Sequence, residues 1–352
     1  MENFDLQLFA EAGDVVNGSA GFVNAYTGDK TEFDESHTLS PELKTFYDTE
    51  LLENARVEMY YAQFAKKQPL PKNHGKSVQW RKWNTFDKAQ QLEEGVIPTG
   101  QKFGISTRVG AVNQYGTYAA ISDVLELRAY DDVILGATEE MGASMAQTQE
   151  TLIRDALLTN TNVLYCDNLD ENGKVVSTPT QPGQMSATCF LTPDMVAKAV
   201  TKLKKDRVPT INGKYYAVIH PSAAYDVRKS KEWIEAHKYA APEQLFNGEI
   251  GELHGCRFVE NVFAPVLGGE YADKDGGVTY ATYILGKSAF GIIDPEGGAE
   301  MIVKPKEVSG GPLNQFSTVG YKLETNGATI LYPERILRVM SCSSYSAEDE
   351  EN

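Results

Sequence analysis

Apolar side chains recur every three or four positions in two long segments of the chain, and this spacing predicts two amphipathic helices. The first helix is expected to begin at Ser40-Pro41, where a hydroxyl cap precedes a proline at the first helical position. It is expected to end by residue 68, because Pro69 and Pro71 cannot continue a helix. Its apolar stripe consists of Leu43, Phe46, Tyr47, Leu51, Ala55, Met59 and Ala62.

The second helix is predicted to start at Asp131 and to run for about 30 residues, which is roughly 45 Å at the standard helical rise. Asp131 and Asp132 lie at its start, where carboxylates interact favourably with the helix dipole. A rod of this length exceeds the width of a typical small domain, so we expect one unusually long helix. Its predicted apolar face consists of Ile134, Ala137, Met141, Met145, Thr148, Leu152 and Ala156.

Between the two helices the pattern changes to the alternation that is typical of strands. Residues 76–83 and 105–111 alternate in this way, and the Gly- and Pro-containing stretch at 92–100 is typical of a turn. Two strands without a third partner are marginally stable alone. We therefore expect an extended two-stranded arm that is stabilised from outside the chain, most simply by a neighbouring subunit.

The arm carries aromatic and cationic side chains close together, at Trp80, Arg81 and Trp83. Such an arrangement can stack on nucleic acid bases. Aromatic and arginine anchors are also typical of protein interfaces. On an arm that needs an external partner, the interface interpretation is favoured.

The rest of the chain mixes helical and strand patterns, which predicts an α+β fold. A hairpin turn is expected at 170–173, and the acidic residues 346–351 are expected to be disordered. Helices are predicted at 192–206 and 221–230, and strands at 215–220, 280–285, 290–293, 316–323 and 328–340.

Composition narrows the class of protein. The net charge of −16 over 352 residues argues against a protein that binds nucleic acid by neutralising phosphates, although acidity can also serve solubility alone. Cys166, Cys189, Cys256 and Cys342 are far apart and form no C-x-x-C pair, so we expect reduced, partly buried thiols in a cytosolic compartment. No segment approaches the ~20 apolar residues of a membrane span, and the first residues fit no secretory signal.

A search for catalytic or ligand-binding motifs finds none, so neither an enzyme nor a metal or cofactor site is expected. His254 and Cys256 supply only two possible ligands, and a metal site needs at least three. The stretch from Asn168 to Gly173 resembles the start of a calcium-binding loop, but Pro179 stands where the closing glutamate is needed. The glycine pairs lack the rest of any phosphate- or dinucleotide-binding motif. A basic cluster is interpreted as a solvated face or a contact to an acidic neighbour, with a nucleic acid patch as the alternative; it consists of Lys198, Lys202, Lys204, Lys205 and Arg207.

Four stretches of sequence, taken in order, point to a known family. They are Leu39-Ser40-Pro41-Glu42-Leu43 with Phe46-Tyr47, then Leu92-Glu93-Glu94-Gly95-Val96, then Tyr115-Gly116-Thr117-Tyr118 with Ser122-Asp123, and the segment from Asn326-Gly327-Ala328 to Arg335-Ile336. Together with the order of the predicted elements, they resemble the major capsid proteins of tailed phages, in particular the N4-like family, whose fold is HK97-like. The resemblance extends from about residue 38 to 343 and rests on the ordered set rather than on any single motif.

The resemblance implies a division of the chain and two sets of interface residues. The implied parts are an N-arm at 1–39, an N-terminal helix at 40–68, an E-loop at 69–118, a peripheral domain with the spine helix at 119–189, an axial domain at 190–300, peripheral-domain strands at 301–345 and an acidic tail at 346–352. The implied subunit-interface residues are Trp80, Arg81, Trp83, Glu93 and Glu94 on the E-loop and Glu243, Phe246 and Glu249 on an axial loop at 240–255.

The resemblance also implies a structural protein that self-assembles, as hexamers and pentamers, into the icosahedral head of a tailed phage. Such a shell would form in the host cytoplasm, become part of the virion, carry a portal protein and enclose double-stranded DNA without sequence-specific contacts. Because the N-arm has only about 39 residues, the scaffold should be a separate protein; whether a decoration protein also binds is left open. The alternatives are an encapsulin-type shell around protein cargo, an enzyme with an unrecognised site and a tail or adhesin protein.

Overall fold

The computed structural model describes residues 59–72, 75–83, 86, 88–89, 91, 100–128, 133–170, 173–238, 249–309 and 314–352. The chain divides into two compact units. Of the described residues, the larger unit contains 59–117, Met141–Met301 and Tyr321–Asn352, and the smaller unit contains Tyr118–Glu140 and Ile302–Gly320. The predicted N-arm and the predicted helix up to residue 58 lie outside the described residues.

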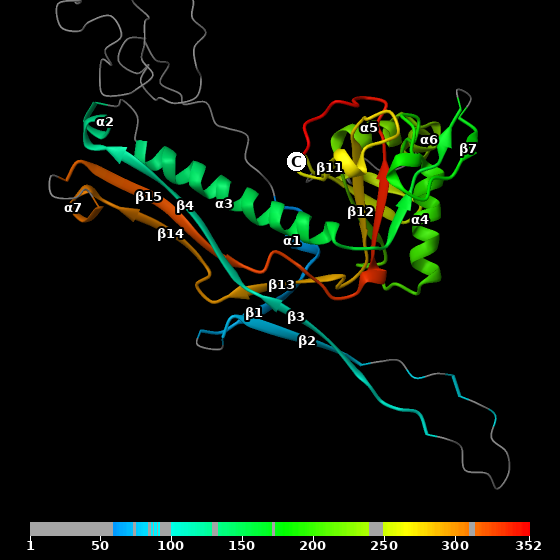
Figure 1. Cartoon of the computed structure of the whole chain (residues 1–352), viewed down its shortest axis with the longest axis horizontal. Helices are drawn as coiled ribbons and strands as arrows, with labels where there is room; N and C mark the ends of the chain where they lie inside the picture. The colour runs from blue at the N-terminus through cyan, green and yellow to red at the C-terminus, as the bar shows by residue number, and fades with distance from the viewer. Residues whose placement is uncertain are drawn as a thin grey trace, which may run out of the picture. The chain divides into compact units, whose positions relative to one another are not determined.

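The larger unit is built on a seven-stranded mixed sheet (Figure 1) with the order β5-β17-β12-β8-β10-β9 and with β11 paired to β12. β12 lies in the middle and is buried at all of its positions, as its run of aromatic and branched side chains predicts. The strands are β5 (Val163–Tyr165), β8 (Tyr215–Ile219), β9 (Glu249–Leu253), β10 (Cys256–Glu260), β11 (Val266–Leu267), β12 (Thr279–Leu285) and β17 (Ile336–Ser341).

Helices cover this sheet, and the alternation of side chains along the strands divides the core into two clusters. Ala217, Ile219 and Ile284 pack with residues of α4 and α5 in one cluster. Val218 and Tyr283, from the opposite face, pack with α1 and with the end of α3. The helices are α1 (Tyr61–Phe64), α3 (Val133–Leu158), α4 (Pro193–Lys205), α5 (Pro221–Lys229) and α6 (Lys231–Lys238).

Two of the predicted helix starts have the expected chemistry. The Thr192 side chain accepts a hydrogen bond from the Met195 amide, and a proline follows at the first position of α4. α5 likewise begins at Pro221, and the His220 side chain caps it through the Ser222 amide. The helix and strand predictions for residues 192–230 are therefore confirmed to within a residue or two.

A smaller three-stranded sheet lies next to the second core cluster and corrects one prediction. β1 (Lys66–Leu70) pairs in parallel with β13 (Phe290–Pro295), which also pairs with β16 (Thr329–Ile330). Residues 66–68 are thus strand, and the prediction of a helix up to residue 68 is wrong at this end. Pro69 has no amide hydrogen, but β1 is an edge strand, where a missing donor is tolerated.

The long helix is confirmed, but its buried face differs from the prediction. α3 has 26 residues, and Asp131 and Asp132 lie outside the described part. Its buried residues are Glu150, Ile153, Arg154 and Leu157, whereas the predicted stripe is only half-buried. Two of the four are charged, which an apolar pattern cannot indicate.

The smaller unit has little buried core of its own. Its elements include α2 (Asp123–Arg128) and α7 (Lys306–Ser309), and the Asp123 amide donates to the Gln315 carbonyl at 2.9 Å. Ile121 and Val319 are among its buried side chains. β4 (Asn113–Ser122), β14 (Ala299–Lys304) and β15 (Phe316–Thr325), which form a sheet in the order β14-β15-β4, have residues in both units, as α3 does.

Three further expectations need correction. The strand predicted at 328–340 is broken, because Pro333 opens a 3-10 helix at Pro333–Arg335 between β16 and β17, which belong to different sheets. Residues 249–253 of the expected axial loop form β9 instead. The segment 346–352 is ordered by contacts described below, so the prediction of disorder there is wrong. The hairpin at 170–173 is confirmed, between β6 (Asn168–Leu169) and β7 (Val175–Ser177).

The domain boundaries implied by the resemblance remain predictions. The seven-stranded sheet joins β12 and β8, from the expected axial domain, to β17 and β5, from the expected peripheral domain.

Two further 3-10 helices lie at Pro182–Gln184 and Gly269–Tyr271.

Candidate functional site

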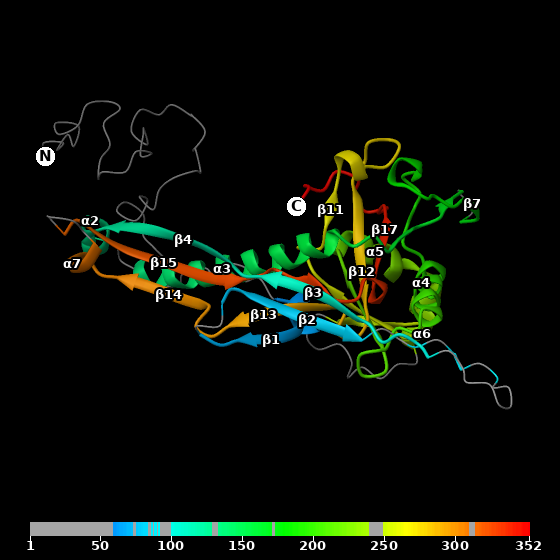
Figure 2. The same ribbon diagram turned by 60° about the horizontal axis from the view of Figure 1, so that its bottom comes forward.

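The predicted arm is a two-stranded antiparallel hairpin of β2 (Ser77–Trp83) and β3 (Ile105–Ala111). Its register runs from Ser77 opposite Ala111 to Trp83 opposite Ile105. Figure 2 shows the hairpin extending away from the β1-β13 strands, with β3 continuing into β4. The prediction of two paired strands without a third is therefore confirmed for the described residues.

The base of the hairpin is held by the chain itself, through the ring of Trp80. This ring is half-buried and lies close to two glycines, at distances where an added side chain would force a neighbour to shift. A Cβ atom at Gly291 would lie 3.0 Å from Trp80 Cζ2, and one at Gly110 would lie 2.9 Å from Trp80 Cζ3. The expectation that the arm is stabilised only from outside is thus wrong at its base, while an interface role for Trp80 stays a prediction.

An ion pair and a cation–π contact add to the attachment of the base. Lys82 Nζ lies 3.0 Å from Glu334 Oε1 and 4.6 Å from the centre of the Tyr332 ring. Partial burial acts to raise the pKa of Glu334, but hydrogen bonds from its own backbone and from Lys82 outweigh this and lower that pKa. Both partners are about half exposed, so the pair contributes at most about 1 kcal/mol.

Beyond the base, three aromatic rings stack on one another and stay open to solvent. The ring centres of Trp83 and Phe103 are 4.2 Å apart, and those of Phe86 and Phe103 are 5.3 Å apart. More than half of each side chain is exposed: 59% of Trp83, 59% of Phe86 and 57% of Phe103. We call these three residues the aromatic cluster. An exposed apolar surface of this kind marks an interaction site. The sequence pattern predicted Trp83 as an interface residue but missed Phe86 and Phe103.

The other predicted interface residues are placed less fully. Arg81 lies in β2 with an exposed side chain. Glu93, Glu94, Glu243 and Phe246 lie outside the described residues. Glu249 begins β9, but its side chain also lies outside the described part. The roles of these residues stay predictions.

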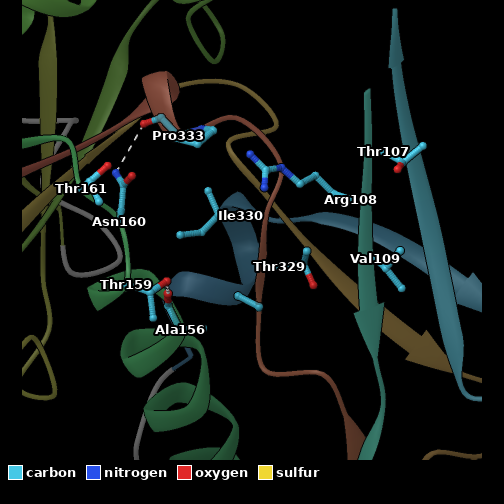
Figure 3. Close-up of a pocket in the computed structure, with 11 residues that line it drawn as sticks. Thr107, Arg108, Val109, Ala156, Thr159, Asn160, Thr161, Thr329, Ile330 and Pro333 are labelled. Carbon is cyan, nitrogen blue, oxygen red and sulfur yellow. Dashed lines mark hydrogen bonds between the residues drawn. The ribbon is translucent and has the colours of Figure 1, made fainter. Parts of the chain in front are cut away.

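An open cleft of about 650 Å³ lies at the base of the hairpin (Figure 3). Ile330 lies in the middle, Arg108 extends toward Pro333 from β3, and the Asn160 amide donates to the Pro333 carbonyl at 3.4 Å. The lining residues are Thr107, Arg108, Val109, Ala156, Thr159, Asn160, Thr161, Ala328, Thr329, Ile330 and Pro333. This lining includes no carboxylate, histidine or thiol, so the cleft suits packing rather than acid–base or nucleophilic chemistry.

A buried carboxylate that no sequence pattern marks lies where α1 meets α3. Glu150 is fully buried, and its Oε1 accepts from the Tyr60 amide at 3.0 Å, the Tyr61 amide at 3.1 Å and the Asn261 side chain at 2.8 Å. Burial raises the pKa of Glu150 and outweighs the lowering effect of these hydrogen bonds. Because α1 has no cap from its own sequence, Glu150 caps it from α3.

The described part of the chain holds four buried thiols and no cluster of metal-ligating side chains. All four thiols are free and buried, and burial raises the pKa of Cys166 and Cys256. No group of three or more histidine, cysteine, aspartate or glutamate side chains among the described residues could hold a metal ion. None of the described helices is long and apolar enough to cross a membrane.

Comparison with known proteins decides the family. Residues 106–333 match the profile of a family described as phage capsid protein. The chain belongs to this family. The major capsid protein of Pseudomonas phage KPP21 is 24% identical to it over an aligned length of 274 residues, and the match covers 64% of this chain and 69% of that protein.

Solved phage capsids share the fold. The capsid of cyanophage P-SCSP1u matches with a TM-score of 0.62 and 16% identity, covering 86% of this chain and 94% of that one. The capsid asymmetric unit of cyanophage Pam1 matches with a TM-score of 0.64 and 12% identity, covering 90% of this chain and 100% of that one.

Membership of the family answers the main questions raised by the sequence. The chain is a bacteriophage capsid protein, a component of the virion that builds a shell from repeated subunits. Its family is a structural one and not an enzyme family. The encapsulin and enzyme alternatives are not favoured.

Proposed function

We propose that this chain is the major capsid protein of a tailed phage of the N4-like group and that it adopts an HK97-like arrangement. In this proposal the chain assembles as hexamers and pentamers into an icosahedral head around double-stranded DNA. The observation that carries the proposal is the family match over residues 106–333, which spans β3, the spine helix α3 and most of the central sheet.

The aromatic cluster is proposed as a subunit contact. Aromatic anchors dominate binding energy where they become fully desolvated. Trp83, Phe86 and Phe103 are already stacked, so little side-chain freedom remains to be lost on binding. A hairpin whose base is fixed and whose outer part presents such a cluster is suited to lie over an adjacent copy of the chain.

The charge of the chain fits a container for DNA. At −16 per subunit, a shell of many copies carries a large negative charge that disfavours tight binding of a polyanion. DNA inside such a shell would be confined by its walls and not gripped by them. A separate scaffold protein and a portal protein complete the proposed assembly, which takes place in the host cytoplasm.

Assembly of the purified chain, sized by light scattering and imaged by negative-stain microscopy, tests the proposal. Closed shells, tubes or capsomer rings are expected, from the chain alone or with its scaffold co-expressed. A chain that stays monomeric at high concentration under both conditions would overturn the proposal.

A matched pair of variants tests the role of the arm. The double variant Trp83→Ala, Phe103→Ala should melt at the wild-type temperature, because the cluster is exposed in the isolated chain, but should fail to assemble. Val176→Ala is the control, since Val176 is an apolar residue 68% exposed on β7 and away from the arm. Normal assembly of the double variant would show that the cluster is not a subunit contact.

A further inference from the structure

The acidic segment 346–352 is bound to the body of the larger unit by two side chains, one near its middle and one at its last residue. Near its middle, Asp349 Oδ2 accepts from Ser222 Oγ at 2.6 Å and from Tyr280 Oη at 2.7 Å. Three residues later, Asn352 Oδ1 accepts from Arg154 Nη1 at 2.9 Å and from the Val266 amide at 3.1 Å.

Main-chain hydrogen bonds follow the same path. The Val278 amide donates to the Ala347 carbonyl at 3.2 Å, and the Asn352 amide donates to the Val266 carbonyl at 3.3 Å. The Asn352 side chain also donates to the Ala264 carbonyl at 3.3 Å. Figure 1 shows the red end of the chain passing over the sheet toward β11. The segment therefore lies extended across the ends of β11 and β12.

The surface under the segment is built from buried donors. Ser222, Tyr280 and Arg154 are all buried, and they come from α5, β12 and α3. Ser222 Oγ, Tyr280 Oη and the Val266 amide all donate to side-chain oxygens of the segment, so these three bonds are lost when the segment leaves. A cluster of donors from separate elements that converge on two side chains has the form of a peptide-binding site.

We propose that Ser222, Tyr280, Arg154 and the β11 backbone form a binding site for an extended acidic peptide with aspartate at one anchor position and asparagine three residues later, and that the segment 346–352 is its occupant. The intervening residues agree with this. Glu348 and Glu350 are exposed, so their charges stay hydrated, while the side chains of Asp349 and Asn352 accept the hydrogen bonds described above. Asp349 is held as a carboxylate, because bonds from Ser222, Ser346 and Tyr280 lower its pKa against the opposing effect of partial burial.

Occupation of the site ties together parts of the larger unit that are far apart in sequence. Arg154 lies near the end of α3, and Ser222 lies in the first turn of α5. The bound segment contacts both and also β11, so it acts as a clasp across the spine helix, α5 and the sheet. Because the segment belongs to the same chain, its effective concentration at the site is high, and the two anchors need only modest affinity.

Amide hydrogen exchange on the full-length chain tests the proposal, with the Val266 and Val278 amides as reporters, since both donate to the segment. In the double variant Asp349→Ala, Asn352→Ala, both amides should exchange about tenfold faster or more than in the wild type. Adding a synthetic peptide with the sequence of residues 346–352 at millimolar concentration should restore the slow exchange. The same peptide with alanine at both anchor positions should not.

Glu350→Ala is the matched control, because it removes one charge from the segment without removing an anchor, and it should leave both reporters unchanged. Unchanged exchange of Val266 and Val278 in the double variant would overturn the proposal. So would faster exchange that the peptide with the native sequence fails to reverse, because a true site must recognise the segment in trans. Both results are independent of shell assembly and leave the proposed function untouched.

Discussion

Replacing Glu150 tests whether a buried carboxylate on α3 holds the start of α1. In Glu150→Ala, the Tyr60 and Tyr61 amides and the Asn261 side chain lose their common acceptor, and the last two groups are buried. Each unsatisfied buried donor costs about 1–3 kcal/mol, so we expect a destabilisation of about 3–5 kcal/mol. Urea unfolding of the unassembled chain, followed by circular dichroism, measures it.

Glu150→Gln separates the hydrogen bonds from the charge. Glutamine keeps the accepting oxygen, so the stability at neutral pH should stay within about 1.5 kcal/mol of the wild type. The pKa of Glu150 is raised in the fold, so the folded state favours the protonated acid. In the wild type, this residue should therefore lower stability progressively as the pH rises from its ordinary pKa of 4.5 to the raised value, and the loss should stay constant above that.

The glutamine variant should lack this part of the pH dependence, so its stability relative to the wild type should increase across that window. Glu126→Gln, an exposed position on α2, is the control and should not alter the slope. A loss below about 1 kcal/mol in Glu150→Ala would refute the capping argument. An unchanged pH slope in Glu150→Gln would refute the assignment of the raised pKa to this residue.

Three further predictions concern the arm and the thiols. Gly291→Ala should displace the Trp80 ring and destabilise the chain by about 1–3 kcal/mol, as measured by thermal melting. An unchanged melting temperature would mean that the ring can move aside. Lys82→Ala should cost at most about 1 kcal/mol, less at high salt, because its pair with Glu334 is half exposed; a loss independent of salt would contradict this. Cys256 is buried and its pKa is raised, so iodoacetamide followed by mass spectrometry should modify it after unfolding but not in the native chain.

The sequence was a good guide where structure depends on local periodicity. The spine helix and the two strands of the arm are regular over many residues, so their existence could be predicted, and Thr192-Pro193 marked the start of α4 within one residue. β1 was missed because its conformation depends on pairing with β13, more than 200 residues later in the chain.

The candidate site was predicted only in part for the same reason. Trp83 stood out beside a cation, but its partner Phe103 lies on the other strand, and only the hairpin register brings the two rings together. The burial of Glu150 depends on Asn261 and on the start of α1, which no pattern along α3 can reveal. The acidic residues near position 349 suggested disorder. Their order could not be seen in the local sequence, because the hydrogen-bond donors to Asp349 come from α5 and β12.

The burial of all four cysteines has a practical consequence for the particle that this protein builds. Since the chain has no other cysteine, a single new one at an exposed position would be the unique reactive thiol on each subunit. Val176 on β7 is such a position, because it is largely solvent-exposed and lies in a short hairpin away from the arm. A Val176→Cys shell could then carry one dye, drug or antigen per copy at defined spacing. The buried native thiols would not compete for the label.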